Sequence, residues 1–154
     1  MSAPATGVGP SFEVVYEEQR LPLIRLAVLL TGSREHAEDA VQAVFTAAFP
    51  RWNSIAQPLS YLKRAVVNSC ADVHRRRARD RRAVLDREPV TGIPEVDETW
   101  AVLRDLPPRQ RAVVVLHFYE DLPLVQIGRL LGRPAATVRS DLRRALGTLR
   151  EDLA

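Results

Sequence analysis

Hydrophobic positions along this chain recur every three to four residues, which is the period of an amphipathic α-helix. Residues 34–49 show this pattern, with apolar positions at Ala37, Val41, Val44, Phe45 and Ala48. The period of two that marks a half-buried strand is not visible, and Ala, Leu, Arg and Glu dominate the composition. The sequence therefore predicts an all-α fold.

Prolines and glycines divide this helical pattern into two groups. Pro22 either kinks the first helix, which follows Ser11, or starts another one. A loop is expected at 51–57, and Pro58 then opens a long helix. Residues 83–96 contain two prolines and a glycine without a helical period, which is typical of a linker. We expect a disordered N-terminus at 1–10 and two small helical domains, 11–82 and 97–154, joined by the linker 83–96.

The long helix that begins at Pro58 has two different faces. Apolar residues gather on one side, at Leu59, Leu62, Val66, Cys70 and Val73, and polar residues on the other, at Arg64, Asn68, Arg75 and Arg79. The helix runs into an arginine-rich stretch at 75–82. Such a run binds nucleic acid or an acidic partner, or is simply a solvated face.

The C-terminal quarter predicts a helix-turn-helix. Leu124, Ile127, Leu130 and Leu131 mark a first helix, Gly132 and Pro134 a turn, and Val138, Leu142, Ala145, Leu146 and Leu149 a second helix. The outer face of this second helix combines small residues with arginines at 139, 143 and 144. Small residues allow close approach to a DNA groove, and arginines bind guanine edges and phosphates. The alternative is a solvated amphipathic helix.

Charge and rare residues narrow the classes of function. The net charge is only +3, but residues 63–87 and 109–154 are basic while 88–108 are acidic. Two basic surfaces favour nucleic acid over a membrane surface. The single cysteine, Cys70, excludes an internal disulfide, and no His/Cys spacing suggests a metal site. Without a phosphate loop, a nucleophile motif or a membrane span, we expect no cofactor, no catalysis and a cytoplasmic location.

Three segments together resemble a bacterial extracytoplasmic-function (ECF) RNA polymerase sigma factor. They are "LAVLLTGSREHAEDAVQAVFTAAFPRW", "YLKRAVVNSCADVHRRRAR" and "LPPRQRAVVVLHFYEDLPLVQIGRLLGRPAATVRSDLRRALGTLRE", in the family's order. The resemblance implies that the N-terminal domain, region two, recognises and melts the minus-ten promoter element. It implies that the C-terminal domain, region four, reads the minus-thirty-five element. The expected partners are core RNA polymerase, through its β′ clamp coiled coil and β flap, promoter DNA and an anti-sigma factor.

The resemblance also assigns roles to individual residues. It implies polymerase binding by Asp39 and Gln42, and capture of a flipped base by Asn53 and Ser54 in the loop at 51–57. Minus-ten contacts fall on Asn68, Asp72, Arg75 and Arg76, and minus-thirty-five contacts on Arg139, Ser140, Arg143 and Arg144. Trp52 is expected in the core.

One residue of the second helix departs from the family pattern. Asp141 stands where a basic or polar residue is usual, and an acid near DNA phosphates is unfavourable. Either it pairs with a neighbouring arginine such as Arg144, or it accepts a hydrogen bond from a cytosine amine. Two other functions remain open from the residues alone: a stand-alone helix-turn-helix regulator, and a sigma-like protein that only binds partners.

Overall fold

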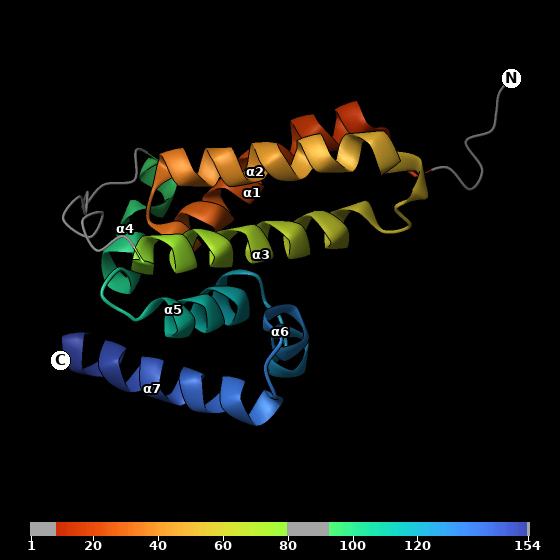
Figure 1. The fold of residues 1–154 in the computed structure, drawn as a ribbon. Helices are drawn as coiled ribbons and strands as arrows, with labels where there is room; N and C mark the ends of the chain where they lie inside the picture. The colour runs from red at the N-terminus through yellow and green to blue at the C-terminus, as the bar shows by residue number, and fades with distance from the viewer. Residues whose placement is uncertain (1–8, 80–92, 154) are drawn as a thin grey trace, which may run out of the picture.

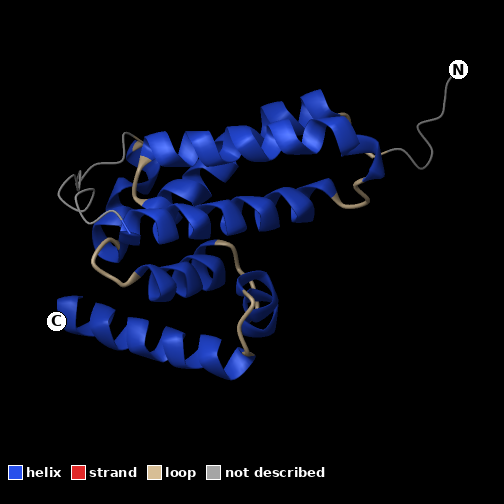
Figure 2. Cartoon of the chain, in the orientation of Figure 1, coloured by secondary structure: helices blue, strands red, loops and turns tan. Residues whose placement is uncertain are grey.

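The computed structural model describes residues 9–79 and 93–153, and every regular element in these two ranges is a helix (Figure 2). The predicted all-α class is confirmed. We divide the helices by their order along the chain into two groups, α1–α3 and α4–α7; α4 itself lies beside the first group, where it contacts α1 (Figure 1). None of the helices in these ranges combines the length and the apolar character that a bilayer crossing requires.

The first group consists of α1 (Phe12–Thr31), α2 (Arg34–Ala48), the 3₁₀ helix η1 (Phe49–Ser54) and α3 (Pro58–Arg79). The helix α1 continues through Pro22, so this proline does not start a second helix. The Ser11 hydroxyl caps α1 by accepting from the Val14 N–H at 3.3 Å. The three long helices pack on one another around fully buried side chains, among them Leu26, Leu29, Val41, Phe45, Leu62 and Val66.

Two expectations for this group are wrong. Residues 51–54 continue the 3₁₀ helix η1 rather than a loop, and the Ser54 hydroxyl closes its last turn by donating to the Arg51 carbonyl at 2.7 Å. Leu59 fits the apolar face of α3 by its spacing, yet it is 47% exposed. Leu59 lies in the N-terminal turn of α3. The helical period alone does not show how far along a helix its apolar face is covered by neighbouring helices.

The second group consists of α4 (Pro94–Leu103), α5 (Pro108–Val114), the π-helix η3 (Val115–Tyr119), α6 (Leu124–Leu131) and α7 (Ala135–Leu153). The helix α7 packs on α5 and α6. Most of the expected linker lies outside the described residues, but its last part contains the first turn of α4. The fully buried side chains here include Val113, Leu116, Ile127, Val138 and Ala145.

The two groups are in direct contact. The buried guanidinium of Arg111 donates from Nη2 to the Leu30 carbonyl of α1 at 3.1 Å and from Nη1 to the Leu106 carbonyl at 3.2 Å. Ion pairs Arg25–Glu95 and Lys63–Glu120, both with N–O distances of 3.1 Å, also cross between the groups. In the view of Figure 1, α3 lies below α2 and above α5 and α7; α1 is in direct contact with α4, α5 and η3, and α3 contacts α6.

Candidate nucleic-acid interface

The turn between α6 and α7 depends on two glycines. Gly132 ends α6 with φ +66°, a left-handed conformation that glycine adopts without strain. At Gly128 a Cβ atom would lie 2.6 Å from the Arg133 carbonyl oxygen, so only glycine allows this close approach. The Arg133 N–H in turn donates to the Gly128 carbonyl at 2.9 Å. These contacts fix the direction in which α7 leaves the turn.

The helix α7 presents its predicted DNA-contacting residues to solvent. Val138 and Ala145 are completely buried and define the inner face of the helix. Arg139, Arg143 and Arg144 are exposed and Ser140 is half-buried. The four positions are therefore accessible to DNA, as a helix docked in the major groove requires. Their contacts with bases stay a prediction.

Asp141 lies on the inner face of α7, and its side chain is 4% exposed. Its Oδ2 atom accepts from Arg109 Nε of α5 at 3.0 Å and from Arg133 Nη1 of the turn at 3.2 Å. Of the two expected alternatives, the structure shows the first, pairing with arginine, but the partners are Arg109 and Arg133 rather than Arg144. Because position 141 is three positions after 138 and four before 145, the carboxylate shares the buried side of the helix.

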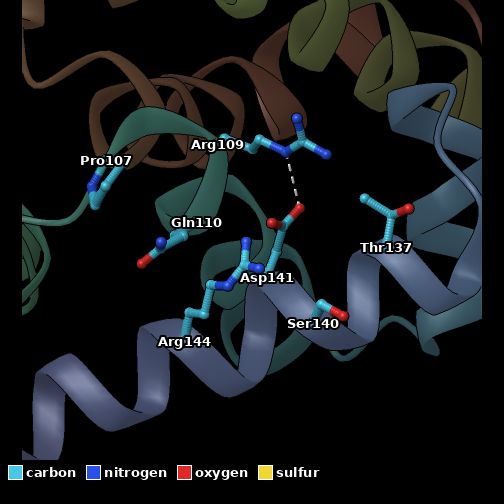
Figure 3. Close-up of a pocket in the computed structure, with 7 residues that line it drawn as sticks. All are labelled: Pro107, Arg109, Gln110, Thr137, Ser140, Asp141 and Arg144. Atoms are coloured by element: carbon cyan, nitrogen blue, oxygen red, sulfur yellow. Dashed lines mark hydrogen bonds and ion pairs between the residues drawn. The ribbon is translucent and has the colours of Figure 1, made fainter.

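A cavity of about 360 Å³ opens between α5 and α7, beside Asp141 (Figure 3). Arg109 and Arg144 line it from the two helices, together with polar side chains of α7. The pKa of Arg133 is lowered, first by its desolvation and then by the charge of Arg109, while Asp141 opposes the shift. The complete lining is Pro107, Arg109, Gln110, Thr137, Ser140, Asp141 and Arg144.

The predicted minus-ten residues of α3 fall on one continuous helix. Asn68 is exposed, as is Arg64 one turn before it. Asp72, Arg75 and Arg76 lie within α3, but their side chains are outside the described residues. Positions 68, 72, 75 and 76 follow the spacing that places residues on one side of a helix.

The two residues predicted to capture a flipped base have different surroundings. Asn53 is exposed and lines a cavity of about 600 Å³ between η1 and the start of α1. Trp52 forms part of its wall, is buried as expected, and donates from Nε1 to the Pro10 carbonyl at 3.0 Å. Ser54 is exposed outside this lining, with its hydroxyl bonded to the Arg51 carbonyl.

The two predicted polymerase-binding residues, Asp39 and Gln42, are both exposed on α2. Gln42 borders an apolar cavity of about 390 Å³, and its Oε1 accepts from the Tyr16 hydroxyl at 3.3 Å. Phe49, which is 58% exposed, lines the same cavity. The sequence analysis missed this aromatic cluster, whose members come from α1, α2 and η1: Phe12, Tyr16, Phe45, Phe49 and Trp52.

Arg109 and Arg133 are the other side chains that the sequence analysis missed. The available signal was Asp141 itself, which falls on the apolar side of α7 by spacing. A buried carboxylate requires a cationic partner, so an arginine from another element was to be expected. Elsewhere, Cys70 is buried as predicted, and its desolvation raises the pKa of the thiol to about 12. Within residues 9–79 and 93–153, no three His, Cys, Asp or Glu side chains are grouped so as to hold a metal ion.

Comparison with known proteins identifies the family. Residues 15–80 match the family model "Sigma-70 region 2", and residues 102–151 match "Sigma-70, region 4". The RNA polymerase sigma-E factor of Streptomyces avermitilis is 31% identical over 157 residues, with 92% of this chain and 84% of that protein covered. The ECF RNA polymerase sigma factor SigM of Mycobacterium tuberculosis is also 31% identical, with coverage of 97% and 80%.

The chain belongs to the ECF family of RNA polymerase sigma factors. The resemblance seen in the sequence is thereby confirmed. This sigma factor acts with RNA polymerase and promoter DNA in the initiation of transcription. Its fold is similar to that of the sigma factor RpoE from Bartonella quintana, solved in complex with the anti-sigma factor NepR. The TM-score is 0.67 at 22% identity, and the match covers 92% of this chain and 97% of the other.

Proposed function

We propose that this sigma factor reads two promoter elements with two separate surfaces, one on each helical group. The observation that carries the proposal is the outer face of α7. There Arg139 and Arg143 are exposed opposite the buried Val138, on the second helix of a tightly built helix-turn-helix. This arrangement fits a helix docked in the major groove, where arginines bind guanine edges. We assign the minus-thirty-five element to Arg139, Ser140, Arg143 and Arg144.

In this proposal, residues of α3 and η1 bind the minus-ten element. Asn68 is exposed on α3, and the helix continues through Asp72 and the arginines at 75 and 76. Asn53 borders a cavity with an aromatic wall, which suits an unstacked base. We assign base capture to Asn53 and Ser54. Such capture offsets the free energy of unpairing, which is on the order of a few kcal/mol for each flipped base.

Core polymerase holds the two surfaces at a fixed separation. We assign polymerase docking to Asp39 and Gln42 on α2, against the β′ clamp coiled coil, with a second contact from the C-terminal domain to the β flap. Linking two weak DNA contacts in one assembly raises the effective concentration of the second one. The domains 11–82 and 97–154 would then serve as the two reading modules, with 83–96 as the linker.

Catalysis belongs to the polymerase in this account, so the chain itself is not an enzyme. It works where the polymerase meets the chromosome, in the cytoplasm. An anti-sigma factor is a further expected partner, since the family resemblance implies one.

Mapping of transcript starts tests the proposal. Core polymerase is incubated with fragmented genomic DNA, with and without the full chain, and the 5′ ends of the transcripts are sequenced. We expect new start sites that share one upstream and one downstream element. A stand-alone regulator would instead bind a palindrome as a dimer without polymerase. A protein that only binds partners would tolerate loss of the arginines at 75–79 and 139–144. No new start sites, together with tight DNA binding by the chain alone, would contradict the proposal.

A further inference from the structure

Asp141 is an acid in the proposed DNA-reading helix whose side chain is turned away from the exposed Arg139 and Arg143. Its side chain is on the same side of α7 as Val138 and Ala145, which are completely buried, whereas Arg139 and Arg143 are exposed. A base held by Arg139 and Arg143 would lie on the far side of the helix from this carboxylate. Asp141 therefore has a role other than reading a base.

The carboxylate of Asp141 holds two arginines from outside its own helix. One oxygen, Oδ2, accepts from both Arg109 and Arg133, at 3.0 and 3.2 Å. One negative charge thus faces two positive charges, and the net charge of the three side chains is positive. The Arg109 side chain remains 55% exposed, so the ion pair fixes its direction without withdrawing it from solvent.

The surroundings of Arg109 fit an anion. It lines the cavity between α5 and α7 together with Arg144, and the hydroxyl-bearing residues Thr137 and Ser140 line the same cavity (Figure 3). Guanidinium groups and hydroxyls are the usual protein ligands of DNA phosphates. Ser140 and Arg144 are also at the edge of the proposed DNA-reading face, so a backbone phosphate next to the groove would reach this cavity.

We propose that Asp141 is a positioning residue, which holds Arg109 beside α7 so that Arg109 contacts a phosphate of the DNA backbone. The inference rests on the proposed function of region four and deepens it. Arg109 then supports binding to every promoter equally and carries no base preference, because phosphates are common to all sequences. Asp141 acts on DNA only through the arginines that it holds.

This role reverses the simple electrostatic expectation. Removal of an acid near DNA makes the protein more positive and, by charge alone, strengthens its binding to DNA. Removal of an acid that positions a phosphate-binding arginine weakens binding instead. Whether Asp141→Asn strengthens or weakens DNA binding therefore distinguishes a purely electrostatic effect from the positioning role.

The test measures promoter affinity of the holoenzyme, assembled from core polymerase and the full chain, across a salt series. The variants are Asp141→Asn, Arg109→Ala and the double variant, and Glu151→Gln is the control because it removes an exposed acid near the end of the same helix. We expect each single variant to weaken binding severalfold on every promoter. The slope of log affinity against log salt should become shallower by about 0.9, the value for one lost phosphate contact.

The double variant measures whether Asp141 acts through Arg109. We expect it to bind no worse than Arg109→Ala, because residues that act as a unit are not additive. Unchanged or tighter binding by Asp141→Asn would overturn the inference, and so would additive losses or a change of preference at one base pair.

Two further readouts keep the test decisive. If circular dichroism shows that Asp141→Asn does not fold, the test rests on Arg109→Ala alone. This variant must still weaken binding to every promoter and make the salt slope shallower, and an unchanged slope overturns the inference. Transcription by the wild-type holoenzyme is scored first. If the wild-type holoenzyme gives no transcript, the proposed function is contradicted. If it gives transcript but Arg109→Ala leaves promoter affinity and the salt slope unchanged, only the role of Arg109 is contradicted.

Discussion

Two glycines in this sigma factor have the same backbone conformation in different surroundings. Gly32 ends α1 with φ +74°, and Gly132 ends α6 with φ +66°. A Cβ atom at Gly32 would lie 2.4 Å from the buried ring of Trp100, whereas a Cβ atom at Gly132 would meet nothing within 4 Å. The first glycine therefore serves the contact between the two helical groups, and the second serves only the turn of the helix-turn-helix.

The pair of variants Gly32→Ala and Gly132→Ala separates backbone strain from packing. Left-handed backbone costs an L-residue about 1–2 kcal/mol, so both variants should lose that much free energy of unfolding. Gly32→Ala should lose more, because Trp100 has to move away from α1. Urea unfolding of both variants measures the difference. Equal losses would contradict the role given to the Trp100 contact.

The helices of this molecule could be predicted from the sequence because the hydrophobic period indicates which side of each helix is buried. Along α7 it separated the buried Val138 from the exposed Arg139 and Arg143. The period does not say which distant segment covers that side. The ion pair of Asp141 with Arg109 joins residues 32 positions apart, and the Arg111 bond to the Leu30 carbonyl joins residues 81 apart. Such contacts depend on tertiary packing and were not predictable from local pattern.

The reading face of α7 yields a prediction at the level of the helix. Arg143→Ala should relax promoter choice at a single base pair of the minus-thirty-five element, at a loss of about 1–3 kcal/mol for the preferred base. Arg150→Ala is the matched control, since Arg150 is exposed on the same helix beyond its N-terminal half. Competition binding of the holoenzyme to promoters with single substitutions measures the preference. A uniform loss at all positions would instead assign Arg143 to a phosphate.

At the scale of the whole molecule, the closed arrangement of the two helical groups does not fit simultaneous reading of two promoter elements. A compact chain of this length has a radius of gyration of about 15 Å and measures roughly 40 Å across. The minus-ten and minus-thirty-five elements are about 25 base pairs apart, or about 85 Å of duplex. Under the proposed function, the contacts between the groups therefore open when both elements are bound.

Charge reversal across this contact should open the free chain. Glu95→Lys with Glu120→Lys places lysines against Arg25 and Lys63, in place of two ion pairs. We expect small-angle scattering to give a radius of gyration near the compact value of about 15 Å for the wild type and a larger value for the variant. Glu151→Lys with Asp152→Lys makes the same change of charge at exposed positions of α7 and should stay compact. Equal radii for the two variants would show that these ion pairs do not hold the groups together.

The central claim is that one chain, held by polymerase, reads two promoter elements together. The most direct measurement is the transcript yield from a promoter that the holoenzyme uses, after the DNA between its two elements is lengthened in single-base steps. Because B-DNA turns once in about 10 base pairs, an insertion of about five moves one element to the opposite side of the duplex. The account predicts a narrow optimum of spacing and an almost complete loss of transcript at half a turn. A yield that is independent of spacing would contradict it.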